Sequence, residues 1–261
     1  MGVRRFGHTN VLGVQTLLKR EVLRFLTVYT QTLLAPIATA ALFLFVFSLA
    51  LADRRGEVLG TPFIAFLAPG IVMMTVIQNA FANTSSSMII AKVQGNIVDT
   101  LMPPLSAGEL TFGIAIGGAV RGVLVAVLAG AVLFPAAGVG LAEPLWALFF
   151  VCSGALLLSL IGLAGGIWAD KFDHMAAVTN FVVTPLSFLS GTFYSIEALP
   201  PAMAALLRYN PFFYLIDGFR YGALGVSDSE PWVGALVIIA ANIAMWALCW
   251  RLFKIGYKLQ S

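Results

Sequence analysis

Charged residues are scarce in this chain of 261 residues, since only 10% are Asp, Glu, Lys or Arg, whereas 60% are hydrophobic. Soluble domains contain about 25% charged residues, so this composition excludes an ordinary water-soluble fold. The mean hydropathy of +0.94 likewise indicates a membrane protein. The net charge of +3 comes from basic residues scattered over the loops, which is not the pattern of a nucleic-acid-binding surface. We therefore expect no nucleic-acid partner.

Residues that commonly act as catalysts or metal ligands, such as cysteine and histidine, are also few. The two cysteines, Cys152 and Cys249, lie in apolar runs at opposite expected faces of the membrane, so a disulfide between them is not expected. The two histidines, His8 and His174, are far apart in the sequence, which leaves no Ser–His pair and no metal-ligand cluster to assemble. No Gly-rich phosphate loop ending in Gly-Lys-Ser or Gly-Lys-Thr is present to cradle ATP. The sequence therefore predicts neither an enzyme nor a metal or cofactor site within this chain.

Six long apolar runs separate the charged stretches. Each is about 20 residues or longer, enough to cross a hydrocarbon core of about 30 Å as a helix. The runs are too long for barrel strands and lack their alternating pattern, so helices are expected. They are Tyr29–Leu51, Phe63–Ser86, Thr111–Phe134, Leu145–Ala169, Met175–Tyr194 and Trp232–Phe253. We predict an all-α membrane protein with six transmembrane helices in a single domain over residues 1–261.

The basic residues are distributed unevenly between the two sides of this topology. Ten of the 15 lysines and arginines lie on the side that holds both termini, the loop of residues 87–110 and the loop around Asp170. Four lie on the other side, and Arg121 lies inside the third run. Because cytoplasmic loops carry the excess of basic residues, both termini are predicted to be cytoplasmic.

Residues 9–29, ahead of the first run, have the pattern of an amphipathic helix. Apolar residues recur at spacings of three and four, while Lys19, Arg20 and Arg24 occupy other faces. Such a helix lies along the cytoplasmic surface of the membrane, and the alternative is a polar start to the first span. The apolar positions are Val11, Val14, Leu18, Val22, Phe25 and Tyr29.

The segment of residues 195–230 is apolar in places but is interrupted by prolines and a glycine. If it crossed the membrane once, the basic C-terminal end would move outside, against the charge rule. A re-entrant helical segment on the outer side, between the fifth and sixth spans, preserves the rule. Within this segment Asp217 and Arg220 can pair on one helical turn, and an exposed pair of this kind contributes well under about 1 kcal/mol.

A few polar residues lie inside the runs. Gln78, Asn79 and Asn83 share one face of the second run, and Arg121 lies near the middle of the third. A charge at the bilayer centre costs about 2.5–3.5 kcal/mol, so Arg121 should face the bundle interior or water. These side chains either hydrogen-bond neighbouring helices or form the polar wall of a translocation path. No run carries a mid-membrane carboxylate to pair with Arg121, which disfavours an ion-coupled carrier.

The loop of residues 87–110 has the composition of a short structured element. Asn96 can cap a helix that ends before Pro103. This helix either docks a cytosolic partner or belongs to a plain connector.

Three segments together are similar to the type-2 ABC-transporter permeases. They are Phe188–Pro201 (FLSGTFYSIEALPP), Asn210–Gly222 (NPFFYLIDGFRYG) and Leu101–Glu109 (LMPPLSAGE), the last followed by Gly113 and Arg121-Gly122. The resemblance extends over nearly the whole chain and is strongest to the short bacterial permeases that include drug and lipo-oligosaccharide exporters.

The resemblance implies a half-transporter in the bacterial inner membrane that moves a lipid-linked glycoconjugate, a lipid or a drug outward. Two permease chains, expected to be identical, would pair in the bilayer above two separate ATPase subunits, which would bind ATP and Mg. An ion-coupled carrier and a non-transporting membrane scaffold are the alternatives.

The resemblance also implies roles for three groups of residues. Gly95–Met102 would be the coupling helix that enters the ATPase, residues 9–29 the interface helix beside it, and Ser195–Tyr221 an outer gate of broken re-entrant helices. The coupling residues would be Asn96, Asp99, Leu101, Met102 and Glu109. The gate residues would be Pro200, Pro201, Asn210, Pro211, Asp217 and Arg220.

Overall fold

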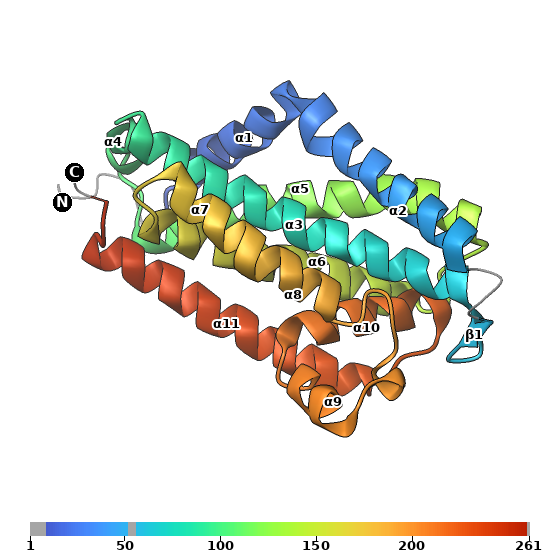
Figure 1. The fold of residues 1–261 in the computed structure, drawn as a ribbon. Coiled ribbons are helices and arrows are strands. Elements are labelled where there is room, and N and C mark those ends of the chain that lie inside the picture. The colour runs from blue at the N-terminus through green and yellow to red at the C-terminus, as the bar shows by residue number, and fades with distance from the viewer. Residues whose placement is uncertain (1–8, 52–55, 260–261) are drawn as a thin grey trace.

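The computed structural model describes residues 9–51 and 56–259, which are almost entirely helical (Figure 1). The helices are α1 (Val11–Thr27), α2 (Ala35–Leu51), α3 (Phe63–Val93), α4 (Ile97–Leu101), α5 (Ala107–Ala137), α6 (Pro144–Trp168), α7 (Phe172–Val178), α8 (Thr184–Leu189), α9 (Pro201–Leu207), α10 (Pro211–Leu224) and α11 (Pro231–Ile255). Two π-helical segments, η1 (Thr30–Leu34) and η2 (Thr179–Val183), and one 3-10 turn, η3 (Ile196–Ala198), connect them. The all-α prediction is confirmed apart from a small antiparallel hairpin, β1 (Glu57–Val58) and β2 (Thr61–Pro62).

Five helical stretches among the described residues are long and apolar enough to cross a membrane. They are Thr30–Ala50, Phe63–Val93, Ala107–Ala137, Pro144–Trp168 and Pro231–Ile255. These match five of the six predicted runs. The helices α3 and α5 also continue into the loop of residues 87–110, beyond the apolar residues that marked the runs.

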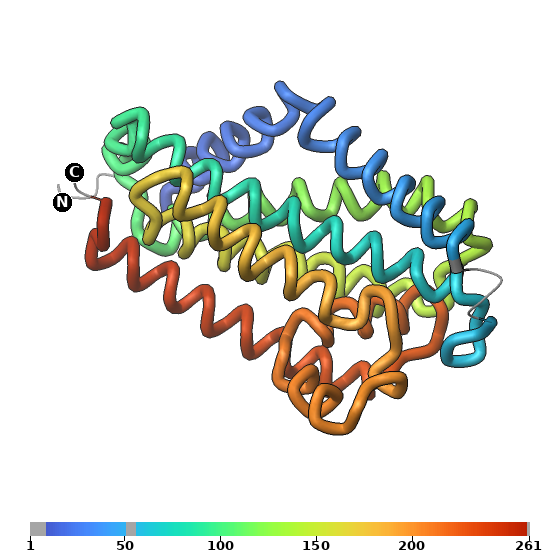
Figure 2. The backbone as a smooth tube through the Cα atoms, viewed as in Figure 1, coloured from blue at the N-terminus to red at the C-terminus, as the bar shows by residue number. Residues whose placement is uncertain are grey.

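The remaining predicted run, Met175–Tyr194, is not a single α-helix. Its residues lie in α7, η2 and α8, which follow one another along the bundle (Figure 2). The helix ends at Leu189 rather than Tyr194, because the chain turns at Gly191, whose φ of +83° suits glycine. The predicted boundary was therefore wrong at its C-terminal end.

Both π-helical segments end two residues before a proline, Pro36 in the first run and Pro185 in the fifth. A proline has no N–H to donate, and its ring clashes with the carbonyl four residues earlier. A wider π turn accommodates the ring without ending the helix. The first of these turns lies where α1 and α2 meet at an angle (Figure 1).

The central helix of the bundle is α3, which packs against α2, α5, α6, α8 and α10. Glycines on its neighbours allow a close approach. A Cβ added to Gly162 of α6 would lie 2.4 Å from the carbonyl oxygen of Phe81, and one added to Gly118 of α5 would lie 2.6 Å from Cγ2 of Thr84. Small residues at such contacts are typical of membrane bundles, where helices gain little from burying apolar surface.

The two ends of the bundle carry different elements (Figures 1 and 2). The start of α1, the helix α4 and the end of α11 lie at one end, whereas the hairpin, α9 and α10 lie at the other. Along residues 195–230, α10 packs against α3, α6 and α11, whereas α9 has no buried residue. The segment thus returns toward the start of α11 without running the length of the bundle.

The Gly162 contact provides a test of this packing. Gly162→Ala should lower the stability of the bundle by about 1–3 kcal/mol, because the added methyl group overlaps backbone that cannot retreat. Gly130→Ala is the matched control on α5, since nothing lies within 4 Å of its added Cβ. A thiol-reactive dye that reports exposure of the buried Cys249, in a Cys152→Ala background, measures the apparent melting temperature. Equal melting temperatures for the two variants would contradict the packing.

Candidate coupling and translocation site

The short helix predicted in the loop of residues 87–110 is α4. Ile97 and Thr100 point inward and are buried, whereas Asp99 and Met102 are exposed and Leu101 is partly buried. Asn96 stands at the N-cap position, but its side chain does not cap the helix as expected, because its amide lies 3.4 Å from Oε1 of Gln94 instead. The exposed surface of α4 is thus formed by Asp99, Met102 and the apolar Val98.

Glu109 joins the start of α5 to the start of α1. Its carboxylate accepts hydrogen bonds from the backbone N–H of Ser106 at 2.6 Å and, in return, the Ser106 hydroxyl caps the N–H of Glu109, which makes a capping box. The same carboxylate accepts a 2.6 Å hydrogen bond from the backbone N–H of Asn10. The C-terminal end of the loop that carries α4 is therefore held to the start of α1 by hydrogen bonds of Glu109.

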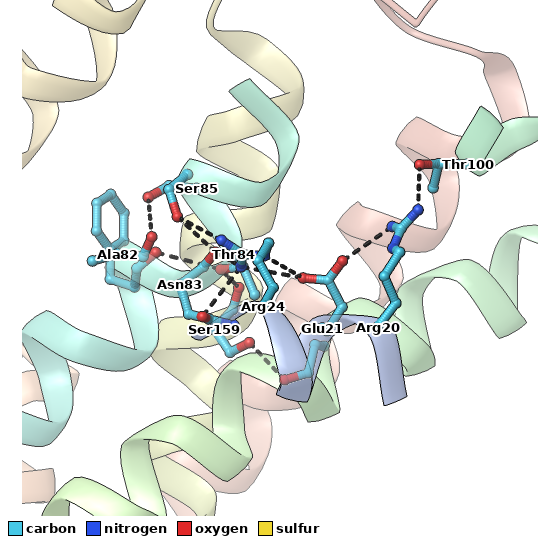
Figure 3. A network of polar contacts seen from close by, with 12 residues as sticks. Arg20, Glu21, Arg24, Ala82, Asn83, Thr84, Ser85, Thr100 and Ser159 are labelled. Atoms are coloured by element: carbon cyan, nitrogen blue, oxygen red, sulfur yellow. Dashed lines mark hydrogen bonds and ion pairs between the residues drawn. The ribbon is translucent and has the colours of Figure 1, made fainter. Parts of the chain in front are cut away.

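Glu21 of α1 is the central residue of a polar network at this end of the bundle (Figure 3). Its side chain is 1% exposed and forms ion pairs with Arg20 at 3.0 Å and with Arg24 at 3.2 Å. Gly117 of α5 makes room for it, since a Cβ there would lie 2.5 Å from the Cβ of Glu21. The buried face of α1 is therefore Leu17, Glu21 and Phe25, and a carboxylate occupies its middle.

The two arginines reach different elements of the fold (Figure 3). Arg24 donates to the carbonyl oxygen and to Oδ1 of Asn83, at 2.7 and 3.1 Å, and to the hydroxyl of Ser86 at 3.3 Å, all on α3. Arg20 donates to the hydroxyl of Thr100 on α4 at 3.0 Å. The helix α1 is thus bonded to α3 on one side and to α4 on the other.

These two connections differ in strength. The ion pairs of Glu21 with Arg20 and Arg24 lie within α1, so they position both arginines but do not themselves cross to another helix. Arg24 adds three hydrogen bonds to α3, so α1 and α3 are firmly joined. The contact from Arg20 to Thr100 is a single hydrogen bond of a side chain that is 46% exposed, and such a bond contributes about 0.5–1.5 kcal/mol.

The burial of Glu21 was not predicted from the sequence, because a carboxylate between two basic residues of an amphipathic helix resembles a solvent-exposed charge. The available signal was its spacing of four from both Leu17 and Phe25. Lys19, by contrast, is exposed, and it lines the rim of a groove of about 750 Å³ between α1, α3 and α4.

Arg121 lies inside the bundle and bonds to the face of α3 that carries the other polar residues. Its Nη2 donates to Oδ1 of Asn79 at 2.7 Å, and Asn79 donates in turn to the carbonyl of Thr75. The hydrogen-bond acceptor for Arg121 is therefore a side-chain amide rather than a carboxylate. Asn79 and Asn83 are one helical turn apart, so Arg121 and Arg24 bond to neighbouring positions of one α3 face.

A cavity of about 410 Å³ lies between α2, α3 and α8. Its lining is mixed, with Gln78, Asn79 and Thr75 beside Phe43 and Phe188. Of the four residues predicted for a translocation path, Gln78 and Asn79 border this cavity, whereas Asn83 and Arg121 do not line it. Arg121 bonds to Asn79, and Asn83 bonds to Arg24.

Asp217 and Arg220 form a second buried polar cluster, at the other end of the bundle. They lie 3.5 Å apart with side chains 1% and 0% exposed, so the sequence-based assumption of an exposed pair does not apply. The carboxylate accepts from the N–H groups of Asp228 and Ser229 at 2.8 and 2.9 Å, and from the Ser229 hydroxyl at 2.6 Å. The guanidinium lies 3.9 Å from the centre of the Phe66 ring and donates to the carbonyl of Gly191. This cluster therefore connects α10 to α3, to the turn at Gly191 that precedes α10, and to residues 228–229 that follow it.

The other predicted gate residues shape the ends of the short helices. Pro200 and Pro201 begin α9, and Pro211 begins α10, where a missing N–H costs nothing. Asn210 caps α10 through the N–H of Phe212 and also donates to the hydroxyl of Ser190 at 2.8 Å.

A charged cluster around Asp170, which lies just after α6, closes the end of the bundle that carries α4. Lys258 contacts Asp170 at 2.6 Å and the carbonyl of Trp168 at 3.1 Å, while Lys92 donates to the carbonyl of Ile167 at 2.8 Å. The hydrogen bond from Lys258 lowers the pKa of Asp170 below its ordinary value, so the pair weakens only as pH falls into the acid range. Two ammonium groups thus neutralise the negative C-terminal end of α6.

Most of the chain is similar in sequence to known proteins. Residues 13–224 match the family described as ABC-2 type transporter. The inner membrane transport permease YadH of Escherichia coli K12 is 34% identical over 254 residues, which cover 97% of this chain and 99% of YadH. Nodulation protein J of Rhizobium leguminosarum bv. trifolii is 28% identical over 79% of this chain and 80% of its own length. Nodulation protein J of Rhizobium meliloti is 25% identical over 79% of each chain.

The Asp217–Arg220 pair predicts a large effect of a small change. Asp217→Asn should destabilise the chain by about 3–5 kcal/mol, because it leaves the guanidinium of Arg220 buried without its counter-charge. The double variant Asp217→Asn/Arg220→Met should recover part of this loss in apparent melting temperature. Asp170→Asn is the control, since its partner Lys258 is exposed. A double variant less stable than Asp217→Asn would argue that the pair is not coupled.

Proposed function

Because the chain belongs to the ABC-2 type transporter family, we propose that it is the permease of an ATP-driven exporter in the bacterial inner membrane. It is a membrane transport permease subunit, and it moves a hydrophobic or amphiphilic substrate outward. The observation that carries this proposal is the similarity to an inner membrane transport permease over 97% of the chain. A lipid-linked glycoconjugate, a lipid or a drug would suit the mixed polar and aromatic lining of the cavity beside Gln78.

The proposed topology has six crossings with both termini in the cytoplasm. The composite helix from Phe172 to Leu189 is the fifth crossing, and its length of about 27 Å at 1.5 Å per residue approaches the thickness of the hydrocarbon core. Residues 195–230 form the re-entrant segment on the outer side. The excess of basic residues at the end that carries α4 supports this orientation.

The energy for transport comes from a separate ABC ATPase, which binds ATP and Mg. Two copies of this ATPase serve two copies of the permease, which pair as a homodimer within the bilayer. The exposure of Asp99 in α4 and of Met102 directly after it supports α4 as the contact with the ATPase. An ion-coupled carrier or a membrane scaffold would have no such subunit, so purification of the tagged chain from membranes, followed by identification of a co-purified ATPase, separates the three functions.

The contact with the ATPase can be tested on α4. Asp99→Arg places the opposite charge on the exposed surface of α4 and should lower the amount of co-purified ATPase at least about tenfold, a loss of about 1.4 kcal/mol. Asp173→Arg is the matched control, because it reverses an exposed charge in the first turn of α7, at the same end of the bundle. Equal recovery of the ATPase with both variants would leave α4 as a mere connector.

The topology can be tested by thiol labelling of intact cells in a background without Cys152 and Cys249. A cysteine at position 99 should resist an impermeant maleimide, whereas cysteines at positions 143 and 197 should react. Position 99 lies in α4 at one end of the bundle, whereas Glu143 precedes α6 and Glu197 lies in η3, both at the other end. Permeabilised cells provide the control for reactivity at position 99. Labelling of position 99 from outside would reverse the orientation.

A further inference from the structure

We propose that the hydrogen bond between Arg20 and Thr100 is the joint through which α4 passes its movement to α1 and α3, and that Glu21 is the positioning residue that holds Arg20 in place. This inference rests on the proposed function, because it takes α4 to be moved by an ATPase. The contacts of Figure 3 carry it in three steps.

The first step is that α1 and α3 move together. Arg24 is bound by the buried carboxylate of Glu21 and by Asn83 and Ser86 of α3. Separating the two helices would break the three hydrogen bonds from Arg24 to α3 at once, while the ion pair with Glu21, which lies within α1, keeps Arg24 in position. This connection is the firm part of the network.

The second step is that α4 is held by one directional contact. Its buried residue Ile97 packs in an apolar cluster, and apolar packing does not depend on direction. Among the described residues, the hydroxyl of Thr100 is the only α4 side-chain group that hydrogen-bonds to another helix. A rotation or a shift of α4 therefore acts first on the distance between Thr100 and Arg20.

The third step is that the signal arrives at the cavity. Asn83 accepts from Arg24, and Asn79, one turn further along α3, borders the cavity together with Gln78. A conformational change requires a contact that differs between two states, and the Arg20–Thr100 bond is suited to this because, among the described residues, it is the one side-chain hydrogen bond that joins the network to α4.

The test uses the complex of the permease with its co-purifying ATPase in membrane vesicles. Gln78→Cys, in a background of Cys152→Ala and Cys249→Ala, reports on the cavity. The labelling rate with an uncharged maleimide is measured with ADP and with ATP plus vanadate, and the ratio of the two rates measures transmission from the ATPase. No transport substrate is needed.

Thr100→Val removes the hydroxyl at nearly constant volume and should weaken the effect of the nucleotide on this ratio about fivefold, the factor that corresponds to one hydrogen bond. Thr100→Ser keeps the hydroxyl and should retain the full ratio. Thr16→Val is the matched control, since the Thr16 hydroxyl donates to the carbonyl of Leu12 in its own helix. All variants should recover the same amount of ATPase.

Arg20→Met cuts the same bond from the other side, and combining it with Thr100→Val should cause no further loss beyond Arg20→Met alone. An unchanged ratio in Thr100→Val, a loss in Thr100→Ser equal to that in Thr100→Val, or additive losses in the double variant would overturn the inference while leaving the proposed function intact. Absence of a co-purified ATPase, or of any nucleotide effect in the unaltered complex, would overturn the proposed function and the inference with it.

Discussion

A charged side chain that leaves water must find its counter-charge or its hydrogen bonds inside the protein, and this requirement organises the bundle. Solvation lost on burial costs several kcal/mol per ion, so each buried charge needs a fixed partner. Among the described residues the buried charged side chains are Glu21, Glu109, Arg121, Asp217 and Arg220. Each belongs to a polar cluster that joins separate elements, so the few charges in this apolar chain define how its helices are connected.

The sequence predicted the parts of the fold that depend on local composition. Five of the six apolar runs form helices of spanning length, because about 20 apolar residues in a row have few other stable arrangements in a bilayer. The short helix in the loop of residues 87–110 and the broken segment of residues 195–230 were also predictable, since prolines mark their ends. The fifth run corresponds to α7, η2 and α8 rather than to one α-helix, and it was predicted to end too late, because a turn at Gly191 cannot be distinguished from an interior glycine by hydropathy.

The candidate site could be predicted only in part, because its key features depend on contacts between distant residues. Asp217 and Arg220 were correctly paired from their spacing, but their burial follows from Phe66 and Gly191, which belong to other elements. Glu21 was missed for the same reason, since its buried position depends on Gly117. Of the residues predicted for a polar translocation path, Gln78 and Asn79 border a cavity, whereas Arg121 and Asn83 do not line it and bond to Asn79 and Arg24, respectively.

The two buried clusters are joined by a single helix. The helix α3 contains 31 residues, or about 46 Å at 1.5 Å per residue. It receives Arg24 at Asn83, near one end, and lies under Arg220 at Phe66, near the other. At this end Arg220 packs on Phe66 of α3, while its partner Asp217 bonds to Asp228 and Ser229 ahead of α11. The helix α10 is therefore packed against α3, whereas α9 has no buried residue. A single helix, α3, thus contacts both the Asp217–Arg220 cluster and the network around Glu21, which lie toward opposite ends of the bundle.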